Sequence, residues 1–323
     1  MKRLWVLAFV FLAGASRAEA GSYVDDPVQN QWFTGSLEAP SPALSKAGVV
    51  SIEPYAIYTR DTGAYDSGWG HYSVPNNVNQ LQSETLFKYG ITDQLSVQTL
   101  PSFSQAWNGL ASSSPTSVGI GDLPIEFQYR VHDGDPRTGF PSVTFGLGMT
   151  FPTGAYDNLS NPLAGFGAGA YVLKEELLFQ SLFATPGGHP MRVRVYGDVY
   201  EPLGDASVRN ASVYGTNYGF RGQANPGLSA DWGIGVEYGL NQRWVLALDA
   251  VQNYAAGFRL TGYDIAGTPT HASGASSTSL ALAPAIEYNF TSSVGLIVGV
   301  EFSVAGRNMP SYVAPQIALS VAF

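Results

Sequence analysis

Hydrophobic and polar residues alternate along most of this chain with a period of two. The clearest stretch follows a Gly-Ile-Gly turn and covers residues 119–131, with the sequence GIGDLPIEFQYRV. Uncharged side chains occupy its odd positions from Leu123 to Val131, whereas charged or amide side chains occupy most of its even positions. Because successive side chains on a strand face opposite sides of the sheet, this pattern predicts a β-strand with one apolar and one polar face.

The same alternation recurs in about twelve segments, each close to the ~9–11 residues with which a tilted strand crosses a bilayer. Residues 169–183 form the least regular segment, because Lys174, Glu175 and Glu176 stand in a row, and a short helix remains an alternative there. The segments are residues 49–60, 78–89, 94–105, 119–131, 141–151, 169–183, 191–200, 228–238, 243–254, 279–290, 294–304 and 312–323.

The connections between these segments alternate in length. Short turns occupy residues 90–93, 132–140, 185–190, 239–242 and 291–293. Longer loops occupy residues 61–77, 107–118, 152–167, 201–227, 257–278 and 305–311. Short periplasmic turns and longer external loops are typical of transmembrane β-barrels. The sequence therefore predicts an all-β protein with a single transmembrane, antiparallel, up-and-down barrel over residues 49–323, closed because unpaired strand edges in lipid cost several kcal/mol per group.

Residues 1–20 have the features of a secretory signal peptide. Lys2 and Arg3 precede an apolar run over residues 4–13, and Ala18-Glu19-Ala20 supplies a small-residue cleavage site. The run is about half the ~20 residues that a membrane-spanning helix needs. We therefore expect export and a location in the bacterial outer membrane. Residues 21–48 are expected to form an irregular periplasmic or plug-like segment, with a mobile tail as the alternative.

The composition agrees with a barrel. Only 13% of the residues are charged, against roughly 25% in soluble proteins, while 45% are hydrophobic. Low charge with ordinary hydrophobicity results when half of each strand faces lipid and half faces a polar interior. A net charge of −9 without a basic cluster argues against a nucleic-acid partner.

Aromatic side chains gather near both ends of the predicted strands, where amphipathic rings suit the membrane–water boundary. The expected periplasmic belt contains Tyr89, Tyr129, Tyr238, Trp244, Tyr288 and Phe323. The expected outer belt contains Tyr58, Trp107, Phe151, Tyr254 and Tyr312. Phe323 also resembles the C-terminal aromatic residue that the barrel-assembly machinery reads. The expected partners are therefore outer-membrane lipids, that machinery and small hydrophobic solutes.

The polar faces place charges of both signs inside the predicted barrel. Such charges are costly unless they are paired or hydrated, so they form either a structural ion-pair network or a water-lined selectivity constriction. Twelve strands lie between the filled eight-stranded barrels and the open porins of 16–18 strands, which leaves both alternatives open. The candidate lumen residues are Glu84, Lys88, Asp122, Glu126, Arg130, Arg192, Arg194, Asp198, Glu237, Arg243, Asp249, Glu287 and Glu301.

The sequence indicates neither catalysis nor a cofactor. The four histidines, His71, His132, His189 and His271, lie in loops or at a strand end without a recognisable nucleophile. The chain has no Cys and no paired His spacing, so no metal site is expected. The turn at residues 119–121 lacks the helix and Lys of a phosphate-binding loop. We therefore expect a protein that is not an enzyme.

Residues 119–131, with the preceding FKYGITDQLSVQTLPSF and the following FPSVTFGLGMTFPTG, resemble the outer-membrane proteins grouped as the "MetA pathway of phenol degradation" or transporter family. The stretch WFTGSLEAPSPALSKAGVVSIEPYAIYT is similar to the region leading into the barrel of that group. The resemblance covers most of residues 31–154. It implies passive uptake of small hydrophobic or aromatic compounds, which Tyr214, Tyr218 and Phe220 in the longest loop also favour. A closed structural or binding barrel with working external loops is the alternative.

Overall fold

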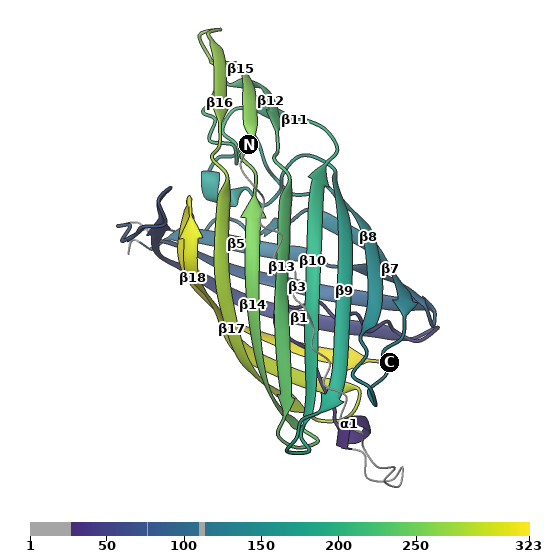
Figure 1. Cartoon of the computed structure of the whole chain (residues 1–323). Coiled ribbons are helices and arrows are strands. Elements are labelled where there is room, and N and C mark those ends of the chain that lie inside the picture. The colour runs from purple at the N-terminus through teal and green to yellow at the C-terminus, as the bar shows by residue number, and fades with distance from the viewer. Residues whose placement is uncertain (1–26, 76, 110–113) are drawn as a thin grey trace, which may run out of the picture.

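The structure, a computed structural model, describes residues 27–75, 77–109 and 114–323, so the expected signal peptide at residues 1–20 lies outside the described part. Twelve antiparallel strands form a closed barrel, as the sequence predicts (Figure 1). Two strands are interrupted and carry two labels each, β4 with β5 and β6 with β7. The barrel strands are β1 (Val50–Tyr65), β3 (Val78–Thr92), β4 (Leu95–Thr99) with β5 (Ser102–Asn108), β6 (Gly119–Ile120) with β7 (Leu123–His132), β8 (Ser142–Phe151), β9 (Val172–Ala184), β10 (Pro190–Pro202), β13 (Ser229–Gly239), β14 (Trp244–Ala255), β17 (Ser277–Asn289), β18 (Val294–Arg307) and β19 (Met309–Ala322).

The barrel closes through β1, which pairs with β19 on one edge and with β3 on the other. Ser51 stands opposite Ala322 in the first pair and opposite Lys88 in the second. Closure pairs the backbone groups that an open sheet would leave exposed in lipid. The uncertain segment at residues 169–183 is strand β9 and not a helix.

Two neighbouring strands depart from the expected continuous segments. β4 and β5 are separated at residues 100–101, where Pro101 has no N–H to donate. The facing strand is interrupted at the same level, between β6 (Gly119–Ile120) and β7. The Gly121 N–H donates to the Ser102 carbonyl at 3.0 Å, so a hydrogen bond still joins the two strands across the break.

The alternating residues separate into an outer and an inner face. On β7, Phe127 and Tyr129 are each 50% exposed, whereas the intervening Gln128 is only 1% exposed. On β14, Leu246 and Leu248 are exposed, whereas the next residue, Asp249, is fully buried. The apolar outer face and polar inner face are those of a transmembrane barrel.

Most of the expected aromatic belt residues lie on the outer face, where Trp244 packs against Tyr288 with 4.7 Å between the ring centroids. Tyr312 is an exception, because its hydroxyl donates to Glu301 at 2.7 Å on the inner face. The placement of Tyr312 in the outer belt was therefore wrong. Its position is even, like that of the inward Gln316, so the alternation itself turns its ring inward.

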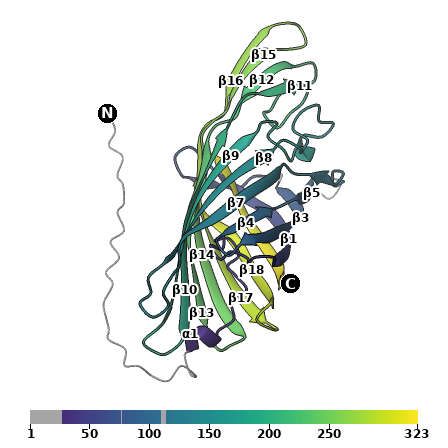
Figure 2. The same ribbon diagram turned by 90° about the vertical axis from the view of Figure 1, so that its right-hand side faces the viewer.

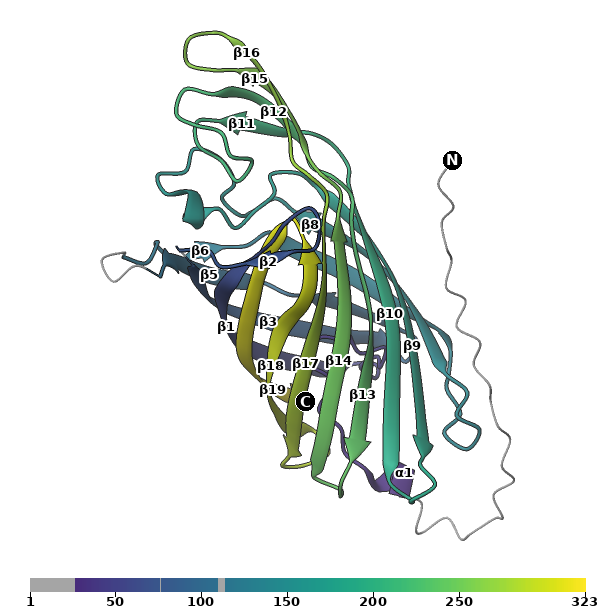
Figure 3. The same ribbon diagram turned by 60° about the vertical axis from the view of Figure 1, so that its left-hand side comes forward.

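The two ends of the barrel differ, as the loop lengths predict. Tight turns connect the strands at one end, called the periplasmic end here; in one of them the Leu240 N–H donates to the Trp244 carbonyl at 2.9 Å. At the outer end, a separate four-stranded sheet stands above one side of the barrel (Figure 3). Val208, Phe220 and Leu260 pack in its small core. Its strands are β11 (Ala206–Arg209), β12 (Arg221–Asn225), β15 (Arg259–Tyr263) and β16 (Pro269–Ser273).

The remaining elements are short. They are the helix α1 (Pro27–Asn30), the 3₁₀ turn η1 (Pro162–Ala164) and the two-residue strand β2 (His71–Tyr72). In the part of the chain that the structure describes, no helix has the length and apolar character needed to cross a membrane.

Candidate functional site

Residues 31–48, called the inner segment from here on, connect α1 to β1 through the interior of the barrel. Both of its ends lie at the periplasmic end. The Trp32 N–H donates to the Gln242 carbonyl in the β13–β14 turn at 3.3 Å, and the Gly48 N–H donates to the Gly90 carbonyl at 2.8 Å. Figure 2 shows α1 beside the periplasmic tips of β10 and β13. The inner segment therefore enters and leaves through the same end and forms a loop inside the barrel.

Carboxylates on β14 and β17 hold the first half of the inner segment. Glu287 accepts a hydrogen bond from the Thr34 N–H at 2.7 Å. Asp249 accepts one from the Leu37 N–H at 3.1 Å and another from the Ser36 hydroxyl. Buried N–H groups need acceptors, and a carboxyl oxygen supplies one. These wall carboxylates therefore replace the sheet partners that this irregular backbone lacks.

Cationic side chains on β3, β7 and β10 hold the second half. Arg194 donates to the Ala39 carbonyl at 2.9 Å, and Arg130 donates to the Pro42 carbonyl at 2.6 Å. Lys88 points at two further carbonyls of the segment, at 3.3 and 3.4 Å. The wall charges are thus sorted by sign, with acids facing the donors of the segment and bases facing its acceptors.

Small residues on the barrel wall make room for the inner segment. Leu37 packs in a buried cluster with Ile297 and two alanines. A Cβ added to Gly299 would collide with the Leu37 side chain, and one added to Gly295 would collide with the Thr34 hydroxyl. Because the interior is close-packed here, larger residues would compete with the segment for space.

Arg192 links the inner segment to the deepest ion pair of the wall. Its guanidinium pairs with Glu237 through two hydrogen bonds, and Arg194 lies 3.6 Å from the same carboxylate. Phe33 of the inner segment stacks on the Arg192 guanidinium, with 4.3 Å from its carbon to the ring centroid. This arrangement desolvates the pair while keeping both charges compensated.

A second charge cluster lies closer to the outer end. Lys174 on β9 contacts three carboxylates, Glu126 at 2.9 Å, Glu176 at 2.7 Å and Asp198 at 3.3 Å. It also lies 5.9 Å from the Tyr200 ring centroid. One cation therefore binds three carboxyl groups on β7, β9 and β10.

The structure places four sequence candidates away from these two clusters. Arg243 precedes β14 and is exposed in the turn, and its guanidinium carbon lies 5.9 Å from the Trp32 ring centroid. The prediction that Arg243 lies inside the lumen is therefore wrong, because its side chain lies at the periplasmic rim. Asp122 accepts hydrogen bonds from external loops, outside the spanning part of the wall. Glu84 and Glu301 bind neighbouring polar side chains on the inner face.

Two features of this site were not among the sequence candidates. Lys174 and Glu176 are absent from the candidates because the register of residues 169–183 is ambiguous in the sequence, although both occupy even, inward positions. The backbone contacts of the inner segment could not be predicted, because nearly every residue type has the same main-chain donor and acceptor. Within residues 27–75, 77–109 and 114–323, no group of three or more potential ligands is arranged for a metal ion.

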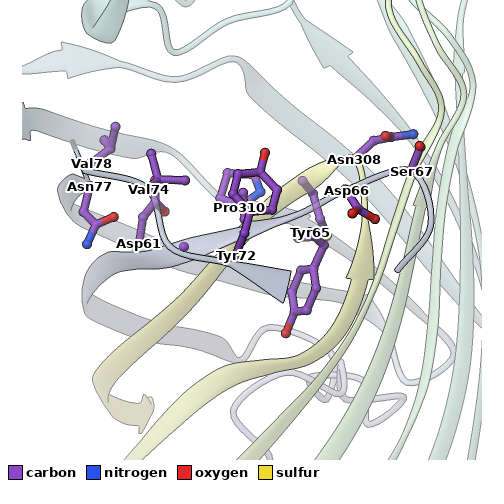
Figure 4. Close-up of a pocket in the computed structure, with 13 residues that line it drawn as sticks. Asp61, Tyr65, Asp66, Ser67, Tyr72, Val74, Asn77, Val78, Asn308 and Pro310 are labelled. Carbon is purple, nitrogen blue, oxygen red and sulfur yellow. The ribbon is translucent and has the colours of Figure 1, made fainter. Parts of the chain in front are cut away.

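A further cavity, of about 560 Å³, lies at the outer rim between the β1–β2 and β18–β19 hairpins. Figure 4 shows Tyr65, Asp66 and Pro310 among the side chains around it. The Asp66 carboxylate accepts hydrogen bonds from the N–H groups of Gly68 and Gly70 at 2.7 and 2.8 Å. The carboxylate orders its own hairpin, so it contributes to the loop rather than to a ligand site.

Comparison with known proteins supports the fold. No family model and no curated protein matches the chain. The COG4313 outer membrane channel from Pseudomonas putida F1 is 15% identical, with 88% of this chain and 99% of that chain covered and a TM-score of 0.65. A TodX deltaS2S3 mutant monoaromatic hydrocarbon channel is 11% identical, with coverages of 93% and 99% and a TM-score of 0.45. The NanC porin is 10% identical, with coverages of 84% and 98% and a TM-score of 0.44. The first likeness shows that this chain shares the barrel fold that the family resemblance implies.

Proposed function

We propose that this protein is a bacterial outer-membrane channel for the passive uptake of small hydrophobic or aromatic compounds, and that the inner segment is its plug. One observation carries the proposal: a segment of the same chain lies inside the lumen and is held there by non-covalent contacts with the wall. A barrel built only for structural support could fill its interior with wall side chains, as eight-stranded barrels do. The COG4313 outer membrane channel from Pseudomonas putida F1 supports this proposal at the level of the fold.

The plug explains how a twelve-stranded barrel avoids being an open pore for ions and sugars. In the proposed resting state the inner segment pairs the wall charges at the periplasmic end and leaves no wide aqueous path there. Passage then requires the segment to shift away from Asp249, Glu287 and Arg194. Charge-assisted hydrogen bonds contribute about 1.5–3 kcal/mol each, so a shift that breaks a few of them is rare but accessible.

The test is solute flux through the purified full-length barrel in liposomes. Uptake of toluene would be compared with uptake of glucose, in the wild type and in a variant lacking residues 27–48. We expect toluene flux in the wild type, and conductance for ions and glucose only after the deletion. If neither protein passes any solute, the transport proposal fails and the alternative, a closed barrel whose external loops bind a partner, takes its place.

We also propose that Phe323 is read by the barrel-assembly machinery. It ends the chain after β19, is 74% exposed, and its N–H donates to the Val50 carbonyl at 2.9 Å across the closing pair of strands. The terminal ring is therefore presented at the seam where the barrel closes. A Phe323→Ser variant should assemble more slowly in membranes containing this machinery and at the wild-type rate in pure lipid, since only the first reaction needs the signal.

A further inference from the structure

An apolar groove of about 540 Å³ lies at the outer mouth of the barrel. Asp122 in its lining precedes β7, whereas Ala255 and Ser277 belong to β14 and β17. In the sheet, β8, β9, β10 and β13 stand between β7 and β14, so these lining residues come from nearly opposite walls. A groove shared by opposite walls lies across the mouth and not on the flank of the barrel. External loops at residues 165–168 and 213–214 complete it.

Aromatic rings and small residues form most of the groove surface. Phe166, Tyr214 and Phe258 supply the rings, and the other lining residues are mainly Gly, Ala, Pro and Val. Tyr214 and Phe258 meet edge to face, with 5.3 Å between centroids and 67° between planes. A Cβ on Gly274 would lie 2.5 Å from the Phe258 ring, so glycine lets this ring lie close to the backbone. Such rings offer both faces and edges to a further aromatic ring.

Two of the three polar side chains in the lining, those of Asp122 and Tyr214, already have partners. Asp122 accepts hydrogen bonds from the N–H groups of Gly154 at 2.9 Å and Ala168 at 2.7 Å. The Tyr214 hydroxyl donates to the Ala168 carbonyl. Burial raises the pKa of Tyr214 to about 12, so the hydroxyl keeps its proton at neutral pH. A charged or strongly polar ligand would therefore lose hydration here without gaining hydrogen bonds.

We propose that this groove binds one small uncharged aromatic or aliphatic molecule and is the receiving site for the solute on the outer side of the channel. Its volume falls within the ~300–1,000 Å³ of small-molecule pockets. The binding itself follows from the groove alone, whereas its role as a receiving site rests on the proposed transport function. Nothing in the proposal requires the plug to move, so the site is occupied in the resting state.

Photolabelling with 3-trifluoromethyl-3-phenyldiazirine, a small uncharged arene, tests this site in the full-length protein in lipid nanodiscs. Labelled peptides would be mapped by mass spectrometry with and without excess toluene. Two variants provide the comparison. Ala275→Phe places a large side chain in the groove lining, and Ala272→Phe makes the same change at an exposed position of β16 outside it.

We expect label on the peptides that carry Phe166, Tyr214 and Phe258, and loss of this label in excess toluene. Labelling there should fall about tenfold in Ala275→Phe, because the added ring takes up space in the groove, and should be unchanged in Ala272→Phe. Label confined to the lipid-facing strands, or label in the groove that toluene does not displace, would overturn the site. The toluene competition on the wild type decides the question even if Ala275→Phe does not fold.

This outcome is separate from that of the transport proposal. Competable labelling without toluene flux in liposomes would keep the binding site and reject the channel function. Toluene flux without competable labelling would keep the channel and reject the groove as its receiving site.

Discussion

At the residue scale, the acidic and basic side chains of the interior contact different groups of the inner segment. Neither a water-filled pore nor an ion-pair network confined to the wall would require this separation. Asp249 and Glu287 accept from the inner segment, while Arg194 and Arg130 donate to it. A charge buried in a barrel must be paired or hydrated. Here much of the pairing comes from the backbone of the inner segment, so under the proposed function these residues would determine how easily the segment moves.

Replacing Asp249 with Ala should loosen the plug. The change removes the acceptor for the Ser36 hydroxyl and the Leu37 N–H, and each lost bond to an ionised group weakens the closed state by about 1.5–3 kcal/mol. We expect spontaneous openings in planar bilayers to become at least about tenfold more frequent. Asn253→Ala, on the same strand but bonded to Ser279 and not to the inner segment, is the control. Equal opening frequencies in both variants would show that Asp249 does not hold the plug.

Two adjacent residues of β9 should respond to neutralisation in opposite ways. Lys174→Met leaves Glu126, Glu176 and Asp198 without their shared cation and should lower the free energy of unfolding by about 3–5 kcal/mol. Glu175→Gln removes a charge from the outward face, where Glu175 is exposed next to Leu177, and should leave stability unchanged or raise it. Urea unfolding in lipid vesicles measures both. Similar losses in the two variants would contradict the inward and outward assignments.

At the element scale, the inner segment occupies a channel formed by glycines and alanines on β13, β17 and β18. Gly235, Gly295 and Gly299 each lie where a side chain would meet the segment. Strand interiors disfavour Gly, and a Gly there often marks a close approach of another backbone. The fit between wall and segment is therefore a property of these strands and not of the charges alone.

A large side chain in place of Gly299 should displace the inner segment. The chain contains no Cys, so Thr34→Cys provides a single thiol that reports on the segment. We expect a membrane-impermeant maleimide to react slowly with this thiol in the otherwise unchanged protein and much faster when Gly299→Leu is added. Gly197→Leu is the matched control, because a Cβ at Gly197 meets only the Trp232 Cβ at an ordinary 3.8 Å. Acceleration by both substitutions, or by neither, would argue against the steric fit.

The elements also show what the sequence could and could not predict. The alternation correctly predicts that Glu126 and Gln128 face inward and Phe127 faces outward, because successive residues of a continuous strand face opposite sides of the sheet. Arg243 shares the parity of Asp249 but precedes β14, where the strand geometry no longer applies. The route of residues 31–48 could not be predicted, since its contacts are made largely by backbone groups whose partners lie up to 257 residues away.

At the scale of the whole molecule, three structural features follow one another along the barrel axis. An apolar groove lies at the outer mouth, an acidic cluster around Lys174 lies below it, and the plug occupies the periplasmic end. Glu84 and Glu301 lie on the inner face outside this cluster, and their negative charge predicts that any residual conductance favours cations. Glu84→Gln combined with Glu301→Gln should reduce the cation preference seen in the reversal potential under a salt gradient, while a preference for anions in the wild type would contradict this charge distribution.

The central claim is that the inner segment must shift for solutes to pass, and a reversible lock tests it most directly. Leu37 and Ala283 pack in one buried cluster, so cysteines are placed at both positions of this otherwise Cys-free chain. A disulfide between them, verified by mass spectrometry before flux is measured, would tie the segment to β17. Toluene flux into liposomes would be measured for the oxidised and the reduced double variant. The account predicts flux close to background when the lock is oxidised and recovery to the wild-type rate on reduction. Equal flux in the two states would contradict it, because solutes would then cross the barrel without moving the segment.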